Sequence, residues 1–90
     1  MRIQNIADKI NGLGGTCGIS SRSREDNRYV VAVTGKLGVY QLEAIDYVSP
    51  SPLSTDADTS SISVRRDGDA SWVVHRTINA LDQLAPKGVM

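Results

Sequence analysis

The chain has 90 residues, of which 40% are hydrophobic and 22% are charged, a composition that supports one folded domain but not two independent cores. Its 10 basic residues balance its 10 acidic residues, and this zero net charge argues against general nucleic-acid binding, which depends on an excess of basic side chains. Cys17 and His75 are the only cysteine and histidine, which excludes an internal disulfide and most metal sites with sulfur and nitrogen ligands.

The first segment, Ile3–Leu13, is predicted to form a short amphipathic helix. Its apolar residues recur at helical spacing and share one face, whereas most polar residues lie away from that face. Gly12, Gly14 and Gly15 can adopt positive φ and predict that the helix ends there. These glycines do not indicate a phosphate-binding loop, because such a loop follows a strand and precedes a helix.

The central part of the chain is predicted to form strands. Thr16–Ser21 favours a short strand, although Gly18 weakens this prediction, and Ser21–Asn27 is expected to be a polar loop. Arg28–Thr34 is the clearest strand, because its valines and tyrosine favour extended backbone. Closely spaced glycines then predict a tight turn into a second strand at Val39–Val48. A helix over residues 39–48 is the alternative, since apolar residues there also recur at helical spacing.

The segment Ser49–Ser61 has a different composition from the rest of the chain. It holds two of the three prolines and is rich in serine and threonine, so it is predicted to be a flexible loop. In Ser61–Arg66, Ile62 and Val64 alternate with polar residues, which predicts a half-buried strand at an edge of the sheet.

The most strongly periodic segment is Asp69–Ala85, which is predicted to form an amphipathic helix. Asp69 or Ser71 can cap its first free amides, and Pro86 ends it. Its apolar residues fall within one arc of a helical wheel. They are Val73, Val74, Thr77, Ile78, Ala80, Leu81, Leu84 and Ala85.

These elements predict a single α+β domain over residues 1–90, with a flexible loop at residues 49–61. The fold would be a small antiparallel sheet of three to four strands, with N- and C-terminal helices packed on one face. The other face of the sheet would be uncovered, which favours either a homodimer or a partner that lies across the sheet. The apolar residues expected on that face are drawn from Val30, Ala32, Val39, Ile45 and Tyr47.

Trp72 is the main candidate for a functional residue. A helix that starts at Ala70 would place it on the polar side of the first turn, with His75 and Arg76 at i+3 and i+4. Tryptophan and arginine are enriched in binding hot spots, which favours an exposed contact surface. The alternative is that Trp72 covers the loop at residues 49–61 or the sheet edge, because large apolar groups are usually covered. The predicted partner-binding residues are Trp72, His75, Arg76, Asn79, Arg65 and Arg66.

A second candidate site is the arginine cluster Arg22, Arg24 and Arg28. Guanidinium groups form paired hydrogen bonds with carboxylates and phosphates, so these residues could bind a small anionic ligand such as a nucleotide, in a pocket shared between subunits. The simpler interpretation is local pairing with nearby acids such as Glu25 and Asp26.

The chain contains no catalytic motif, and we expect neither enzymatic activity nor a cofactor. Its size, single domain and neutral charge are typical of accessory proteins that act by binding, such as those that phages encode to inhibit host or defence proteins. The main hypothesis is therefore a non-enzymatic protein-binding module of this viral type. The alternatives are sequestration of an anionic ligand and a structural subunit of an assembly. The chain shows no signal peptide and no membrane-spanning apolar run, so we expect a cytoplasmic location without membrane contact.

Overall fold

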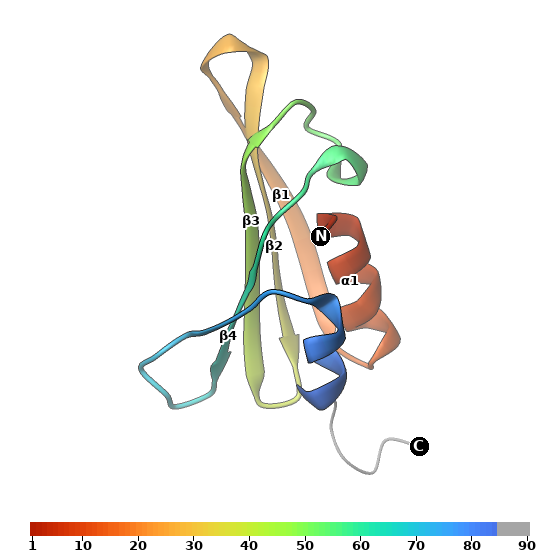
Figure 1. The fold of residues 1–90 in the computed structure, drawn as a ribbon, viewed down its shortest axis with the longest axis vertical. Coiled ribbons are helices and arrows are strands. Elements are labelled where there is room, and N and C mark those ends of the chain that lie inside the picture. The colour runs from red at the N-terminus through yellow and green to blue at the C-terminus, as the bar shows by residue number, and fades with distance from the viewer. Residues whose placement is uncertain (85–90) are drawn as a thin grey trace.

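One antiparallel sheet of five strands forms the centre of the structure, a computed structural model that describes residues 1–84 (Figure 1). The strands lie side by side in sequence order, so each connection joins two neighbouring antiparallel strands. The predicted α+β class is confirmed. The elements are α1 (Ile3–Gly12), β1 (Thr16–Arg24), η1 (Glu25–Asn27), β2 (Arg28–Leu37), β3 (Tyr40–Ser49), η2 (Ser54–Asp56), β4 (Ile62–Arg66), β5 (Val73–His75) and η3 (Ile78–Leu84), where η marks a 3-10 helix.

Helix α1 packs on one face of the sheet, against β1 and β2 (Figure 1). Ile3, Ile6 and Ile10 are fully buried beneath it, as their helical spacing predicts. The helix ends as predicted in a glycine turn, where Gly14 has a φ of 88° and the Gly15 amide donates a hydrogen bond to the Ile10 carbonyl at 2.9 Å.

The segment Tyr40–Ser49 is a strand, so the helical alternative for residues 39–48 is wrong. Its pairing with β2 puts Val33 opposite Ala44, and both side chains are buried on the side of α1. Strand β1 is longer than expected, because residues 21–24 continue it up to the pair Arg24 and Arg28. The polar loop predicted for residues 21–27 is therefore confined to η1, since pairing with β2 keeps these polar residues extended.

The C-terminal helix predicted from Asp69 is wrong in its first half, and Ala85 lies outside the described residues. Val73–His75 forms strand β5 and pairs with β4, which is therefore not an edge strand. The cause is the free edge of β4: two adjacent valines suit extended backbone and gain cross-strand hydrogen bonds there. Only Ile78–Leu84 is helical, as the 3-10 helix η3, and its Leu81 is fully buried in the core that α1 also covers.

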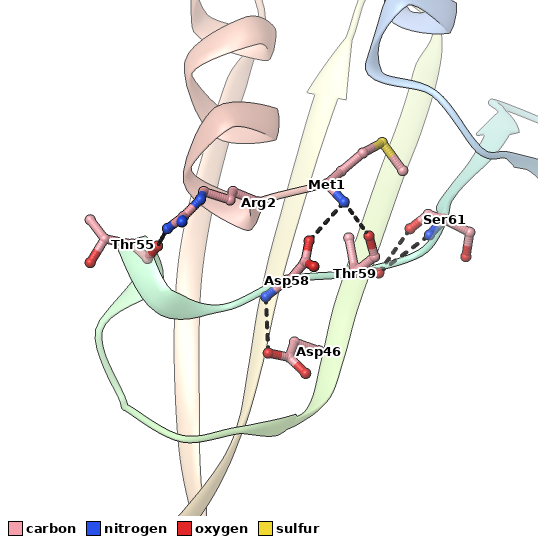
Figure 2. A network of polar contacts seen from close by, with 7 residues as sticks. All are labelled: Met1, Arg2, Asp46, Thr55, Asp58, Thr59 and Ser61. Atoms are coloured by element: carbon pink, nitrogen blue, oxygen red, sulfur yellow. Dashed lines mark hydrogen bonds and ion pairs between the residues drawn. The ribbon is translucent and has the colours of Figure 1, made fainter.

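The segment between β3 and β4 is tied to the N-terminus of the chain (Figure 2). The ammonium group of Met1 lies 2.7 Å from a carboxylate oxygen of Asp58 and donates a hydrogen bond to the Thr59 carbonyl at 2.7 Å. In return, the Thr59 amide donates to the Met1 carbonyl at 2.7 Å. The Asp46 carboxylate accepts a hydrogen bond from the Asp58 amide at 3.0 Å. We call these contacts of Met1, Asp46, Asp58 and Thr59 the N-terminal clasp.

Replacing Asp58 by asparagine is expected to lower the melting temperature at pH 7 but not in acid. The hydrogen bond from the Met1 ammonium group, and then its charge, lower the pKa of Asp58. A carboxyl group whose pKa is lowered by folding stabilises the protein above its unfolded pKa of about 3.9, and this contribution disappears as the pH falls through the lower folded value. Thermal unfolding followed by circular dichroism at several pH values would measure the difference.

The matched control for this experiment is Asp56→Asn, because Asp56 forms no ion pair among residues 1–84. We expect this control to melt like the parent protein at every pH. The assigned ion pair would be contradicted if Asp58→Asn lowered the melting temperature by the same amount at neutral pH and in acid.

Candidate functional site

The face of the sheet opposite α1 is largely open to solvent within residues 1–84. We call it the open face, and it consists of alternate residues of β2 from Arg28 to Lys36 together with their cross-strand neighbours. As expected, Val30, Ala32 and Ile45 lie on this face, where they are partly buried. Val39 instead lies in the turn between β2 and β3.

Trp72 lies at one end of the open face and stacks on Arg65 of β4. The guanidinium carbon of Arg65 is 4.9 Å from the centre of the Trp72 ring, which is a cation–π contact. Trp72 is nevertheless 43% exposed. Trp72 therefore covers a strand of the sheet and still offers a large apolar surface to solvent.

Polar contacts across three strands hold Arg65 in place beneath the ring. Arg65 donates a hydrogen bond from Nη2 to Oε1 of Gln41 at 2.6 Å, and Gln41 donates from Nε2 to Asp67 at 3.3 Å. Asp67 also pairs with the Lys36 ammonium group at 2.8 Å. The hydrogen bond from Lys36 is the main reason that the pKa of Asp67 is lowered, so this carboxylate stays charged near neutral pH. The Trp72 ring thus rests on an ordered support.

Beside the Trp72 ring is an open depression of about 610 Å³. Its lining combines Trp72 with small residues of β1 and β2, such as Gly18 and Gly35, and with longer polar side chains such as Glu43. A concave surface that combines an aromatic residue with polar residues can accept a side chain of a partner and form hydrogen bonds with it.

The other predicted contact residues do not gather around Trp72. His75 is opposite Ile62 in the register of β4 and β5, which places it on the face that carries α1. Arg66 is opposite Tyr40 and is also on that face. The helix expected to group Trp72, His75 and Arg76 is absent there, and the extended backbone of Val73–His75 puts His75 on the opposite face from Trp72. Arg76 follows the strand and is exposed. Asn79 lies exposed on η3, and Arg65 is the predicted neighbour that stacks on the ring.

Sequence reasoning missed the support formed by Gln41, Asp67 and Lys36. These residues come from β2, β3 and the turn after β4, and only strand register brings them together. The alternation of polar Gln41 and Glu43 with buried residues did indicate which β3 side chains face away from the core.

The second candidate cluster lies at the opposite end of the open face, on the hairpin of β1 and β2 that projects beyond α1 (Figure 1). We call residues 20–32 of this hairpin the arm. Arg22, Arg24 and Arg28 share the open face of the arm, and Arg24 is directly opposite Arg28. Among residues 1–84 none of these arginines forms an ion pair, so the expected local pairing is absent there. The Arg24 guanidinium donates instead to the Tyr47 carbonyl at 3.4 Å.

Cys17 and His75 lie on opposite edge strands of the sheet, so they cannot act as a nucleophile and its base. Burial raises the pKa of the Cys17 thiol, which keeps it protonated at neutral pH. Within the part of the chain that the structure describes, no three His, Cys, Asp or Glu residues group as ligands for a metal ion.

Comparison of the chain with protein-family models, with curated proteins and with solved structures finds no match. In residues 1–84 no helix combines the length and the apolar composition needed to cross a membrane. The open face is therefore the main guide to what the protein binds.

Proposed function

We propose that the protein is a cytoplasmic, non-enzymatic module that binds another protein through the Trp72 end of its open face. The observation that carries this proposal is a tryptophan that is 43% exposed and yet fixed by stacking on Arg65. Tryptophan and arginine are the residue types most enriched at the centres of protein interfaces. A ring that is already ordered loses little conformational entropy when a partner covers it.

The surroundings of Trp72 suit a partner that inserts one side chain into the depression. The ring would cover one side of that side chain, while the small residues in the lining allow close approach. Lys36 and Glu43, which also line the depression, would form hydrogen bonds to the partner and exclude water. Val74, which lies on the same face and is 53% exposed, would extend the apolar contact.

The proposed partner is a host or defence protein that a small phage-type accessory protein would inhibit. This part of the proposal rests on the size, neutral charge and single domain of the chain. Sequestration of a small anionic ligand has less support, because the depression of about 530 Å³ that Arg24 and Arg28 line is also lined by the acidic residues Glu25 and Asp26. The competing proposal is that a second copy of the chain occupies the open face and forms a homodimer.

Trp72→Ala is expected to weaken partner binding by about thirtyfold or more, which is the usual effect of removing a central interface tryptophan. The partner would first be identified by affinity capture from the native host with mass spectrometry. Its dissociation constant would then be measured with purified proteins by calorimetry. Circular dichroism should be unchanged, because the ring packs on the surface of the sheet and not in its core.

Tyr47→Ala is the matched control, because Tyr47 is an exposed aromatic residue away from the depression. It should bind the partner with the parent affinity. An unchanged dissociation constant for Trp72→Ala would contradict the proposed site. A parent protein that is dimeric in light scattering and becomes monomeric in Trp72→Ala would show that a second copy occupies the open face.

A further inference from the structure

We propose a second protein-binding surface at the opposite edge of the sheet, where the free edge of β1 accepts an acidic, extended polypeptide segment as an additional strand. This surface is centred on Arg22 and Arg24, at the other end of β1 from the residues Thr16–Gly18 that line the depression beside Trp72. The proposal therefore does not depend on the function assigned to Trp72. Its elements are a long strand edge without a partner strand and the arginines of the arm, which form no ion pair among residues 1–84.

Strand β1 is the outermost strand and is nine residues long, and within residues 1–84 no element pairs with its outer edge. Its residues are exposed along their whole length except Cys17, which is half-buried and bonded to α1. The arm lies beyond the end of the helix, so a new strand could approach it there (Figure 1). An unpaired edge presents backbone N–H and C=O groups that a further strand can pair with.

The edge of β1 has few of the features that normally prevent strand addition. The pairing of β1 with β2 continues without a bulge from Thr16 to Arg24, and the strand contains no proline. Its only charged residues are Arg22 and Arg24, both on the open face. These charges disfavour a basic strand but favour an acidic one, so the edge can discriminate among partners.

The arginines of the arm are arranged for carboxylates at alternate positions of a neighbouring strand. Arg22 and Arg24 are two residues apart, which is about 6.5 Å along a strand, and their side chains lie on one face. Arg28 is directly opposite Arg24, and this like-charged pair is unfavourable until an anion lies beside it. A strand with an acid at every second position would place one carboxylate next to Arg22. A second carboxylate would lie within reach of Arg24 once its guanidinium leaves the Tyr47 carbonyl, to which it donates at 3.4 Å. Ile19, on the other face and 37% exposed, would contact an intervening apolar residue.

A polypeptide fits this edge better than the other anionic polymers or a second copy of the chain. The edge offers alternating donors and acceptors, whereas the phosphates of a nucleic acid only accept hydrogen bonds. Within the described strands of this chain, none carries acids at alternate positions: β3 has Glu43 and Asp46, three residues apart. Self-pairing would therefore leave the arginines of the arm without carboxylates.

The probe for this surface is a fluorescent nonapeptide of alternating threonine and glutamate with blocked ends. We expect it to bind the parent protein and to slow amide hydrogen exchange at alternate residues of β1, as measured by nuclear magnetic resonance. The double variant Arg22→Glu/Arg24→Glu should bind it about tenfold or more weakly, because two cross-strand attractions become repulsions. A peptide with lysine in place of glutamate should show the reverse preference and bind the double variant better than the parent protein.

Two controls test the location of this surface. Arg66→Glu makes the same type of change on the face that carries α1, and Trp72→Ala removes the ring of the other surface. Both variants should bind the glutamate peptide with the parent affinity. If Trp72→Ala still binds the glutamate peptide, the β1 surface acts independently of the Trp72 site. The present proposal would then stand even if the Trp72 site bound no partner.

Three results would overturn the proposal. The first is equal binding of the glutamate and lysine peptides by the parent protein, which needs no variant to fold. The second is a single-stranded oligothymidine that binds through the same arginines more tightly than the peptide does. The third is self-association in light scattering that Ser21→Pro abolishes while peptide binding stays unchanged, which would assign the edge to a second copy.

Discussion

Gly15→Ala is expected to lower the free energy of unfolding by about 3 kcal/mol, at the upper end of what overpacking costs. A β-carbon at this position would lie 2.5 Å from the carbonyl oxygen of Lys36 and 2.8 Å from Cγ2 of Ile10. The Lys36 oxygen belongs to the backbone of β2, so rotation of a side chain cannot relieve the contact. The end of α1 would have to move away from the sheet and disturb the buried face of the helix.

Gly18→Ala is the matched control for this prediction, because a β-carbon at Gly18 would meet no atom within 4 Å. We expect this variant to keep the parent stability or to gain up to about 0.5 kcal/mol, since alanine restricts the unfolded chain. Urea denaturation of both variants would measure the difference. Equal stabilities would show that α1 does not approach β2 as closely as described.

Leu81→Ala is expected to cost about 3 kcal/mol, because it leaves a cavity where a fully buried side chain of η3 meets the core. That is a large share of the roughly 5–15 kcal/mol that stabilises a domain of ordinary size. The substitution would also loosen the packing of η3 on α1. These two elements are joined as well by an ion pair between Lys9 and Asp82 at 2.7 Å.

Leu53→Ala makes the same chemical change at a side chain that is 62% exposed, in the segment between β3 and β4. A change within about 0.5 kcal/mol is expected there, as for most surface substitutions. Urea denaturation of both variants would measure the two losses in the free energy of unfolding. A much larger loss for Leu81→Ala than for Leu53→Ala would show that η3 is docked on the core. Similar losses for the two leucines would mean that Leu81 does not fill the core.

The sequence was sufficient to predict those elements in which the spacing of apolar side chains fits only one type of secondary structure. In α1 the isoleucines repeat at helical spacing and nothing in the segment favours strand, and Arg28–Thr34 combines β-branched residues with flanking turn formers. Both predictions are confirmed. The expected sheet of three to four strands has five, and the additional strand is β5.

The C-terminal segment shows why periodicity alone was not enough. Val73 and Val74 fit the apolar arc of a helix, but they are also β-branched and follow a strand with an unpaired edge. A helical wheel describes one segment alone and cannot include the hydrogen bonds that β4 offers. The same limit applies to residues 21–24, whose polar side chains favour a loop until β2 pairs with them.

The candidate site was predicted in part for the same physical reason. Trp72 and Arg65 were both named from residue type, and the structure does bring them into contact. The grouping of Trp72 with His75 and Arg76 depended on helical geometry and failed with it. Gln41 and Asp67 could not be predicted, because the register across β3 and β4 positions them and no local pattern marks that register.

The N-terminal clasp has a consequence for the order in which the protein folds. Each strand pairs with its neighbour in the sequence, so the sheet can grow hairpin by hairpin with short loops to close. The clasp instead joins Met1 to Thr59 across 58 positions, which makes it one of the contacts with the greatest loop-closure cost. We therefore expect the clasp to close late in folding, after the first three strands have brought the segment that follows β3 beside the N-terminus, whereas α1 can pack earlier on β1 and β2, which follow it in the sequence.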